Sequence, residues 1–129
     1  MIKREYPTSS SPRVSQHDDV HALLVTLSRY AATFDLMLSA WGDRSLYEAV
    51  KEELDAVATG QKALFPEAGV AMMGLTMAHS DIAALLLEMQ VAQHRGLPSK
   101  FGVDELPKRQ RRHEAAVDEL RSYILRKTH

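Results

Sequence analysis

Six histidines are the residues of this chain best suited to bind a metal ion or to transfer a proton. His17 and His21 stand four positions apart, a spacing that places two imidazoles on one face of a helix, as two ligands of a metal site require. A third ligand is needed, and no Glu-x-x-His sequence of the di-iron carboxylate bundles occurs. We therefore expect no metal and no cofactor. A metal or small-ligand site that uses His17, His21 or His79 is kept as an alternative.

His79 and His113 each fall on an apolar stripe of a predicted helix, which suggests a buried pair. In an antiparallel arrangement His79 lies about 16 residues below the top of its helix and His113 about 9 below the top of the next. At ~1.5 Å of helix rise per residue, they are then ~10 Å apart in depth. We predict that they do not share one ion, and that each is a hydrogen-bonded core histidine or a surface histidine.

Residues 68–87 form a stretch of twenty residues with a single formal charge, Asp81. The length suits a bilayer core, but an Asp near the centre of a membrane span costs about 2.5–3.5 kcal/mol. We therefore predict a buried helix of a soluble protein. On a helix Asp81 lies about 200° around from His79, so one of the two is expected to be buried in a polar site. Arg29 is a candidate partner for Asp81, and a structural ion pair is a commoner role than a functional one.

The C-terminal segment carries most of the locally clustered positive charge. On a helix Lys108, Arg111 and Arg112 fall close together on one face, so the segment predicts a basic ridge that contacts phosphates. Glu105, Glu114, Asp118 and Glu119 offer intrahelical partners, which is the alternative interpretation. The candidate nucleic-acid contacts are Lys108, Arg109, Arg111, Arg112, Arg121, Arg126 and Lys127.

Catalytic signatures are missing from the sequence. There are no cysteines, which excludes disulfides, thiolate nucleophiles and zinc–thiolate sites. No Gly-x-Ser-x-Gly elbow, Gly-x-Gly-x-x-Gly turn or P-loop occurs. The net charge of −1 gives no overall field for nucleic acid or anionic membranes. The N-terminus has no apolar run of a secretory signal. We predict a non-enzymatic protein in the cytoplasm.

Hydrophobic periodicity predicts helices throughout the chain and no strand. Residues 1–16 are rich in Ser and Pro and are expected to form a flexible tail. Residues 17–129 are expected to form a single helical domain, since 129 residues correspond to about one domain. The predicted fold is all-α, an antiparallel four-helix bundle with a disordered N-terminal tail. Its helices are expected at about 17–41, 46–64, 67–95 and 105–127.

Apolar residues exceed what one side of a helix needs in the first and third predicted helices. In the first, a heptad stripe from Val20 to Trp41 is accompanied by a second row one position earlier. Such an excess is typical of a dimer interface. We predict a protein–protein interaction or assembly module that forms a homo-oligomer, and alternatively an accessory nucleic-acid-binding or regulatory protein. The candidate dimer surface is Leu23, Tyr30, Met37, Met73 and Met77.

Overall fold

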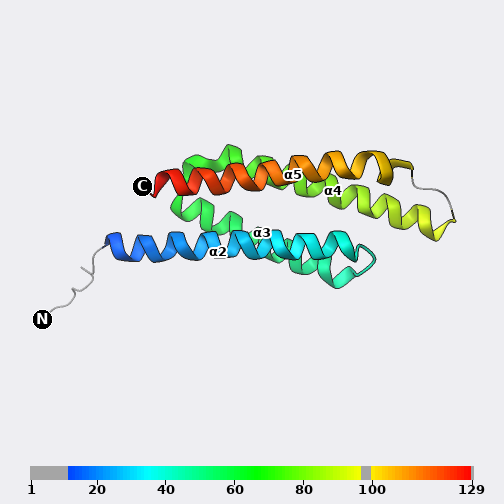
Figure 1. The fold of residues 1–129 in the computed structure, drawn as a ribbon. Helices are drawn as coiled ribbons and strands as arrows, with labels where there is room; N and C mark the ends of the chain where they lie inside the picture. Colours follow the sequence, from blue (N-terminus) through cyan, green and yellow to red (C-terminus); the bar gives the residue numbers. More distant parts are fainter. Residues whose placement is uncertain (1–11, 97–99, 129) are drawn as a thin grey trace, which may run out of the picture.

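The computed structural model describes residues 12–96 and 100–128 as four α-helices joined by short connections. Within these residues the secondary structure is entirely helical, and the helices pack as two antiparallel hairpins, α2 with α3 and α4 with α5 (Figure 1). The predicted all-α, antiparallel four-helix bundle is confirmed. Its elements are α2 (Pro12–Ser39), α3 (Arg44–Leu64), the 3-10 helix η2 (Pro66–Ala68), α4 (Gly69–His94) and α5 (Lys100–Lys127).

Two helices begin earlier than predicted. The first, α2, begins at Pro12 rather than near residue 17, and proline suits a first helical position because its φ is already fixed. Residues 1–11 of the predicted tail lie outside the described residues. The last, α5, begins at Lys100 rather than near residue 105, so Pro107 lies inside the helix instead of in its first turn. The early start of α5 changes the relative depth of residues on α4 and α5.

Local capping sets two of the other helix boundaries. At the start of α3 the Asp43 carboxylate accepts hydrogen bonds from the backbone N–H of Ser45 at 3.0 Å and from its hydroxyl at 2.7 Å. These bonds hold the pKa of Asp43 below its usual value. After α4, Gly96 adopts a φ of 69°, the left-handed conformation that commonly follows a helix and favours glycine.

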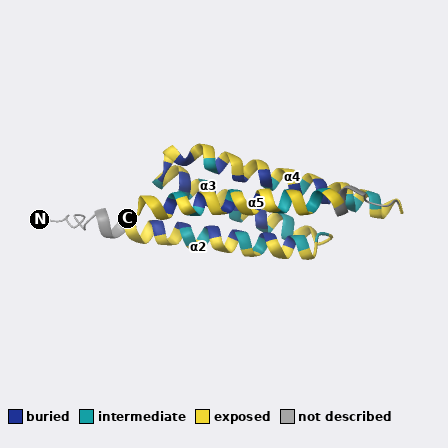
Figure 2. Cartoon of the chain, turned by 45° about the horizontal axis from the view of Figure 1, so that its top comes forward, coloured by how far each residue is buried: buried dark blue, intermediate teal, exposed yellow. Residues whose placement is uncertain are grey.

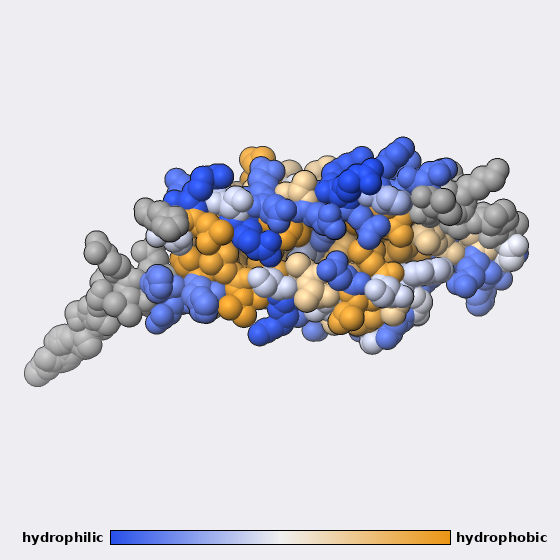
Figure 3. All heavy atoms as spheres, in the orientation of Figure 1, coloured by the Kyte–Doolittle hydropathy of each residue, from blue (hydrophilic) through white to orange (hydrophobic). Residues whose placement is uncertain are grey.

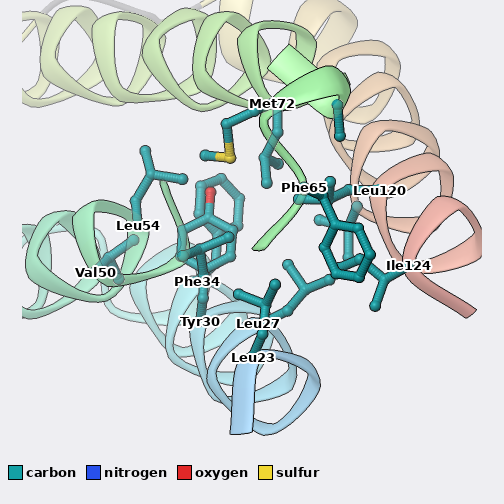
Figure 4. Close-up of a cluster of buried hydrophobic side chains, with 14 of the residues drawn as sticks. Leu23, Leu27, Tyr30, Phe34, Val50, Leu54, Phe65, Met72, Leu120 and Ile124 are labelled. Carbon is teal, nitrogen blue, oxygen red and sulfur yellow. The ribbon is translucent and has the colours of Figure 1, made fainter. Parts of the chain in front are cut away.

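The core lies along the axis of the bundle and receives side chains from all four α-helices (Figure 4). On α2 the buried row includes Leu23, Tyr30 and Met37, which are 4%, 0% and 0% exposed. The assignment of these three residues to a dimer surface is therefore wrong. Helix α2 packs against both α3 and α5, so its wide apolar arc is covered inside one chain.

Candidate functional site

Three polar side chains from three helices meet in the core. The Tyr30 hydroxyl on α2 lies 2.9 Å from Nδ1 of His79 on α4 and 2.8 Å from Nε2 of His113 on α5. Tyr30 is 0% exposed and His113 is 4% exposed, while His79 is half-buried. We call Tyr30, His79 and His113 the buried polar cluster.

The hydrogen-bonding capacity of a phenol constrains the two imidazoles of this cluster. A tyrosine hydroxyl donates only one hydrogen bond but can accept others. When Tyr30 donates to one imidazole nitrogen, the nitrogen of the other histidine must carry the proton and donate to the Tyr30 oxygen. The histidines therefore hold complementary protonation patterns at these two atoms, one nitrogen bare and the other protonated.

Aromatic packing and burial keep the cluster neutral. The ring of His113 stacks on Phe34 with centroids 3.7 Å apart and an interplanar angle of 12°. Burial lowers the pKa of His113 to about 4, and the neighbouring His79 contributes to this lowering. Burial also lowers the pKa of His79, partly opposed by Asp55, and raises the pKa of Tyr30. At neutral pH the cluster is an uncharged network in which the Tyr30 hydroxyl bonds to both imidazoles.

The predicted separation of His79 and His113 is wrong, because both rings bond to one oxygen. With α5 starting at Lys100, the two histidines lie at nearly equal distances along their helices from the α4–α5 connection. The sequence did place both on inward stripes. It did not identify Tyr30 as their partner, although a tyrosine within an apolar arc needs a buried acceptor or donor for its hydroxyl.

Asp81 lies outside this cluster. Its side chain is 53% exposed and its carboxylate is 4.0 Å from Nη1 of Arg112 on α5. Its backbone carbonyl accepts a hydrogen bond of 2.9 Å from Arg109. Of the pair His79 and Asp81, the histidine is therefore the member that lies against the core, and the partner of Asp81 is Arg112 rather than Arg29.

The outward side of α4 forms a second distinctive region. Val70, Met73, Met77, Leu87 and Val91 are 84%, 63%, 61%, 60% and 44% exposed. Together with the small exposed residues Ser80 and Ala84 they follow alternating steps of three and four, the heptad spacing of a coiled-coil seam. We call these seven residues the outer stripe. In Figure 2 this exposed side of α4 lies away from the other helices.

Two of the predicted dimer-surface residues belong to the outer stripe, namely Met73 and Met77. The sequence singled out methionines on this helix but did not separate its inward row from its outward one. The inward row of α4 contains Met72, Leu75, Ile82 and Leu86, all buried. A helix that is apolar on both sides gives little periodic signal, so only the positions of the neighbouring helices reveal which row is covered.

The predicted basic ridge lies on α5, where carboxylates accompany several of its members. Lys108 and Arg109 each lie 3.7 Å from the Glu105 carboxylate, and Arg121 lies 3.2 Å from that of Asp118. In Figure 3 hydrophilic side chains are most abundant toward the upper right, and apolar side chains show in the band between α5 and α2. These ion pairs lessen the positive charge available to a phosphate.

The remaining members of the ridge are not gathered on one patch. Arg111 is exposed, and Arg112 is paired with Asp81. Arg126 and Lys127 stand over the Tyr123 ring, 6.0 and 5.6 Å from its centroid. They lie near the C-terminal end of α5, more than three turns from Arg111 and Arg112.

Metal-ligating residues do not converge in the described part of the chain. There, no three His, Cys, Asp or Glu side chains lie close enough to hold a metal ion. His17 and His21 are both exposed at the start of α2.

A membrane-compatible segment is present, since residues Pro66–His94 are long and apolar enough to cross a bilayer by length and composition, with 33% of the most apolar window buried.

Comparison with known proteins gives no relative from which a role could be transferred. No protein-family model, curated protein or solved structure matches this chain.

Proposed function

We propose that this protein is a non-enzymatic assembly module that associates with itself through the outer stripe of α4. One observation carries the proposal. Five large apolar side chains, each more than two-fifths exposed, follow a heptad spacing from Val70 to Val91. A strict heptad on an exposed helix is the pattern that pairs with another helix.

The energy available from covering this surface is large for a small protein. A Val, Leu or Met side chain contributes about 1.5–3 kcal/mol when it passes from water into a buried site. A symmetric pair would cover the stripe on both copies, because the same surface is used twice. Among the residues whose burial the structure describes, the other large exposed apolar residues are spread over α2 and α5, as Val25, Leu36 and Leu125. Isolated exposures of that kind are ordinary on a monomer.

The chemistry of the core supports a structural role for the buried polar cluster. Tyr30 and His113 are buried, and their hydrogen bonds are made within the cluster. An arrangement of this kind specifies how three helices fit together. We therefore assign the cluster to positioning α4 and α5, and we assign the protein's contacts with other molecules to the outer stripe.

Light scattering coupled to size-exclusion chromatography tests the proposal with two matched variants. Leu87→Asp places a charge on the outer stripe, while Leu36→Asp places the same charge on α2, where Leu36 is 59% exposed compared with 60% for Leu87. The wild type and Leu36→Asp are expected to run as dimers over a wide concentration range. Leu87→Asp is expected to run at the monomer mass of 14.4 kDa.

Two results would contradict the proposal. One is a wild type that stays monomeric at every concentration tested. The other is equal loss of the dimer in Leu36→Asp and Leu87→Asp. A monomer that floats with phosphatidylcholine vesicles, and loses this property only in Leu87→Asp, would instead assign the outer stripe to a lipid surface.

A further inference from the structure

The order of large and small residues along the outer stripe indicates how two copies fit together. We propose that α4 of one copy packs antiparallel against α4 of a second copy, with the two-fold axis between residues 78 and 79. The inference rests on the self-association proposed above. In an antiparallel pair of heptad stripes, each layer of the interface contains one residue from each chain. The two residues of a layer lie at equal distances from the two-fold axis, on opposite sides of it.

This register places each methionine of the stripe opposite a small residue. Met73 faces the partner's Ala84, and Met77 faces the partner's Ser80. Alternating large and small side chains across an interface lets the layers interdigitate without voids. The parallel arrangement lacks this fit, because Met73 and Met77 would meet their own copies and Ser80 and Ala84 would leave gaps. Methionine is unbranched and adapts its shape to the space that a small partner leaves.

The end layer of the stripe also has room for a partner side chain. In this register Val70 of the partner subunit packs against Leu87. Leu87 borders a hollow of about 460 Å³, whose other walls come from the α2–α3 connection, α3 and α4, including Gly42, Tyr47 and Gln90. A valine that is 84% exposed on its own helix would thus find a recess instead of a flat surface.

Charged residues flank the outer stripe on one side of α4. Asp81 marks the side of α4 that faces α5, through its ion pair with Arg112, and Glu88 lies one heptad further along that side. The antiparallel register brings the partner's Glu88 next to Glu67, which lies in η2 just before α4. Two carboxylates brought together in this way require nearby cations.

Two cations stand at the place that the partner's Glu88 reaches. Phe65 packs edge-on against Tyr123 there, with ring centroids 6.2 Å apart. Arg126 and Lys127 stand over the same Tyr123 ring. They can therefore offset Glu67 and the partner's Glu88 together. Two basic residues of the predicted ridge thus gain a role at the interface.

Cysteine cross-linking tests the register directly, since the wild-type chain contains no cysteine. Met73→Cys and Ala84→Cys are prepared as separate full-length variants, and both positions are exposed, so neither substitution opens a cavity in the core. The variants are oxidised alone and as an equal mixture. The mixture is expected to give at least about tenfold more of the mixed disulfide, which joins position 73 of one copy to position 84 of the other, than of either symmetric product, because a disulfide needs Cα atoms within about 7 Å.

The outcomes separate this inference from the proposed function. In the antiparallel register, two copies of position 73 lie about 16 Å apart along the axis at ~1.5 Å per residue, too far for a disulfide. Efficient symmetric products from each variant alone would show a parallel pair and overturn the register. A dimer by light scattering with no cross-link in any sample would overturn it too, yet leave self-association standing. A monomeric wild type would overturn both.

Discussion

Leu86 and Leu87 are neighbours on α4, yet Leu86 is 0% exposed and Leu87 is 60% exposed. The same contrast extends along the whole helix. Its inward face packs against the other helices and carries His79, which bonds to Tyr30, whereas its outward face is apolar without a covering element in the described chain. The inward face therefore determines whether the bundle folds, and we infer that the outward face determines what the bundle binds.

The position of the polar groups sharpens this contrast. The inward face holds the half-buried imidazole of His79, which has a hydrogen-bond partner in the core. A polar network of this kind fixes the relative position of helices more strictly than apolar contacts do. The outward face is mostly apolar, with Ser80 near its middle and Asp81 beside it, paired to Arg112. An interface of this composition gains free energy from burial, and its selectivity must come from the fit of large and small side chains.

Paired truncations give the largest expected difference between the faces. Leu86→Ala should lower the free energy of unfolding by about 2–5 kcal/mol, because it leaves a cavity in the packed core. Leu87→Ala should change it by less than about 0.5 kcal/mol in dilute solution, where no partner is present. Urea unfolding at low protein concentration measures both. Similar losses in the two variants would contradict the assignment of the faces.

Acid should destabilise the core beneath the inward face of α4, where the buried polar cluster lies. Below about pH 6.5 the unfolded chain protonates its histidines, while folded His113 stays neutral until pH falls to about 4. Stability is therefore lost as pH falls from 6.5 to 4, by about 3 kcal/mol for this residue. The lowered pKa of His79 adds to the loss in the same direction.

Unfolding free energies of the wild type and of His113→Gln between pH 7 and 4 check this prediction. The variant should be less stable at pH 7 but should lose less stability on acidification, because the buried imidazole is absent. Carboxylates contribute equally to both curves. Parallel curves would contradict the lowered pKa of His113 in the folded protein.

Removing one oxygen from the buried polar cluster should have a smaller effect. Tyr30→Phe leaves two imidazole nitrogens without their partner, which is expected to cost about 1–3 kcal/mol of unfolding free energy. Tyr47→Phe is the control, because its acceptor, the Trp41 carbonyl, keeps a second donor from Gln90. Thermal unfolding followed by circular dichroism should give a much lower melting temperature for Tyr30→Phe than for Tyr47→Phe. The reverse order would contradict a central role for the cluster.

Two glycine substitutions give the smallest expected effects. Gly74 lies next to the outer stripe, and a Cβ built there meets no atom within 4 Å, so Gly74→Ala should stabilise the monomer by about 1 kcal/mol. A Cβ at Gly60, which lies inside α3, would stand 2.8 Å from Cδ1 of buried Leu23. Gly60→Ala should therefore gain less, or lose stability. Urea unfolding at low protein concentration measures both. Equal gains in the free energy of unfolding would mean that the Leu23 side chain moves aside at little cost.

The helical class and the four helices follow from the spacing of apolar residues, and the inward direction of His79 and His113 follows from the same pattern. Their meeting at Tyr30 does not, because it depends on where α5 begins. Asp104 and Pro107 indicate a start near residue 105, yet the helix extends back to Lys100. Five residues of helix shift the depth of every α5 side chain by about 7 Å, at ~1.5 Å per residue.

The outer stripe was only half predictable for a similar reason. Met73 and Met77 stood out as adaptable apolar residues, but Leu23, Tyr30 and Met37 were assigned to the same surface and lie in the core. Apolar residues surround much of α2 and α4, so periodicity alone does not say which row the neighbouring helices cover. Packing in three dimensions decides it.

The methionine methyl groups report on both faces of α4 at once. Met73 and Met77 lie on the outer stripe, while Met72 is buried on the inward face and Met37 is buried on α2. In a dilution series followed by methyl NMR of methionine-labelled protein, the signals of Met73 and Met77 should shift as the dimer dissociates, and those of Met37 and Met72 should stay constant. Shifts confined to Met37 and Met72, or no concentration dependence at any methionine, would contradict self-association through the outer stripe.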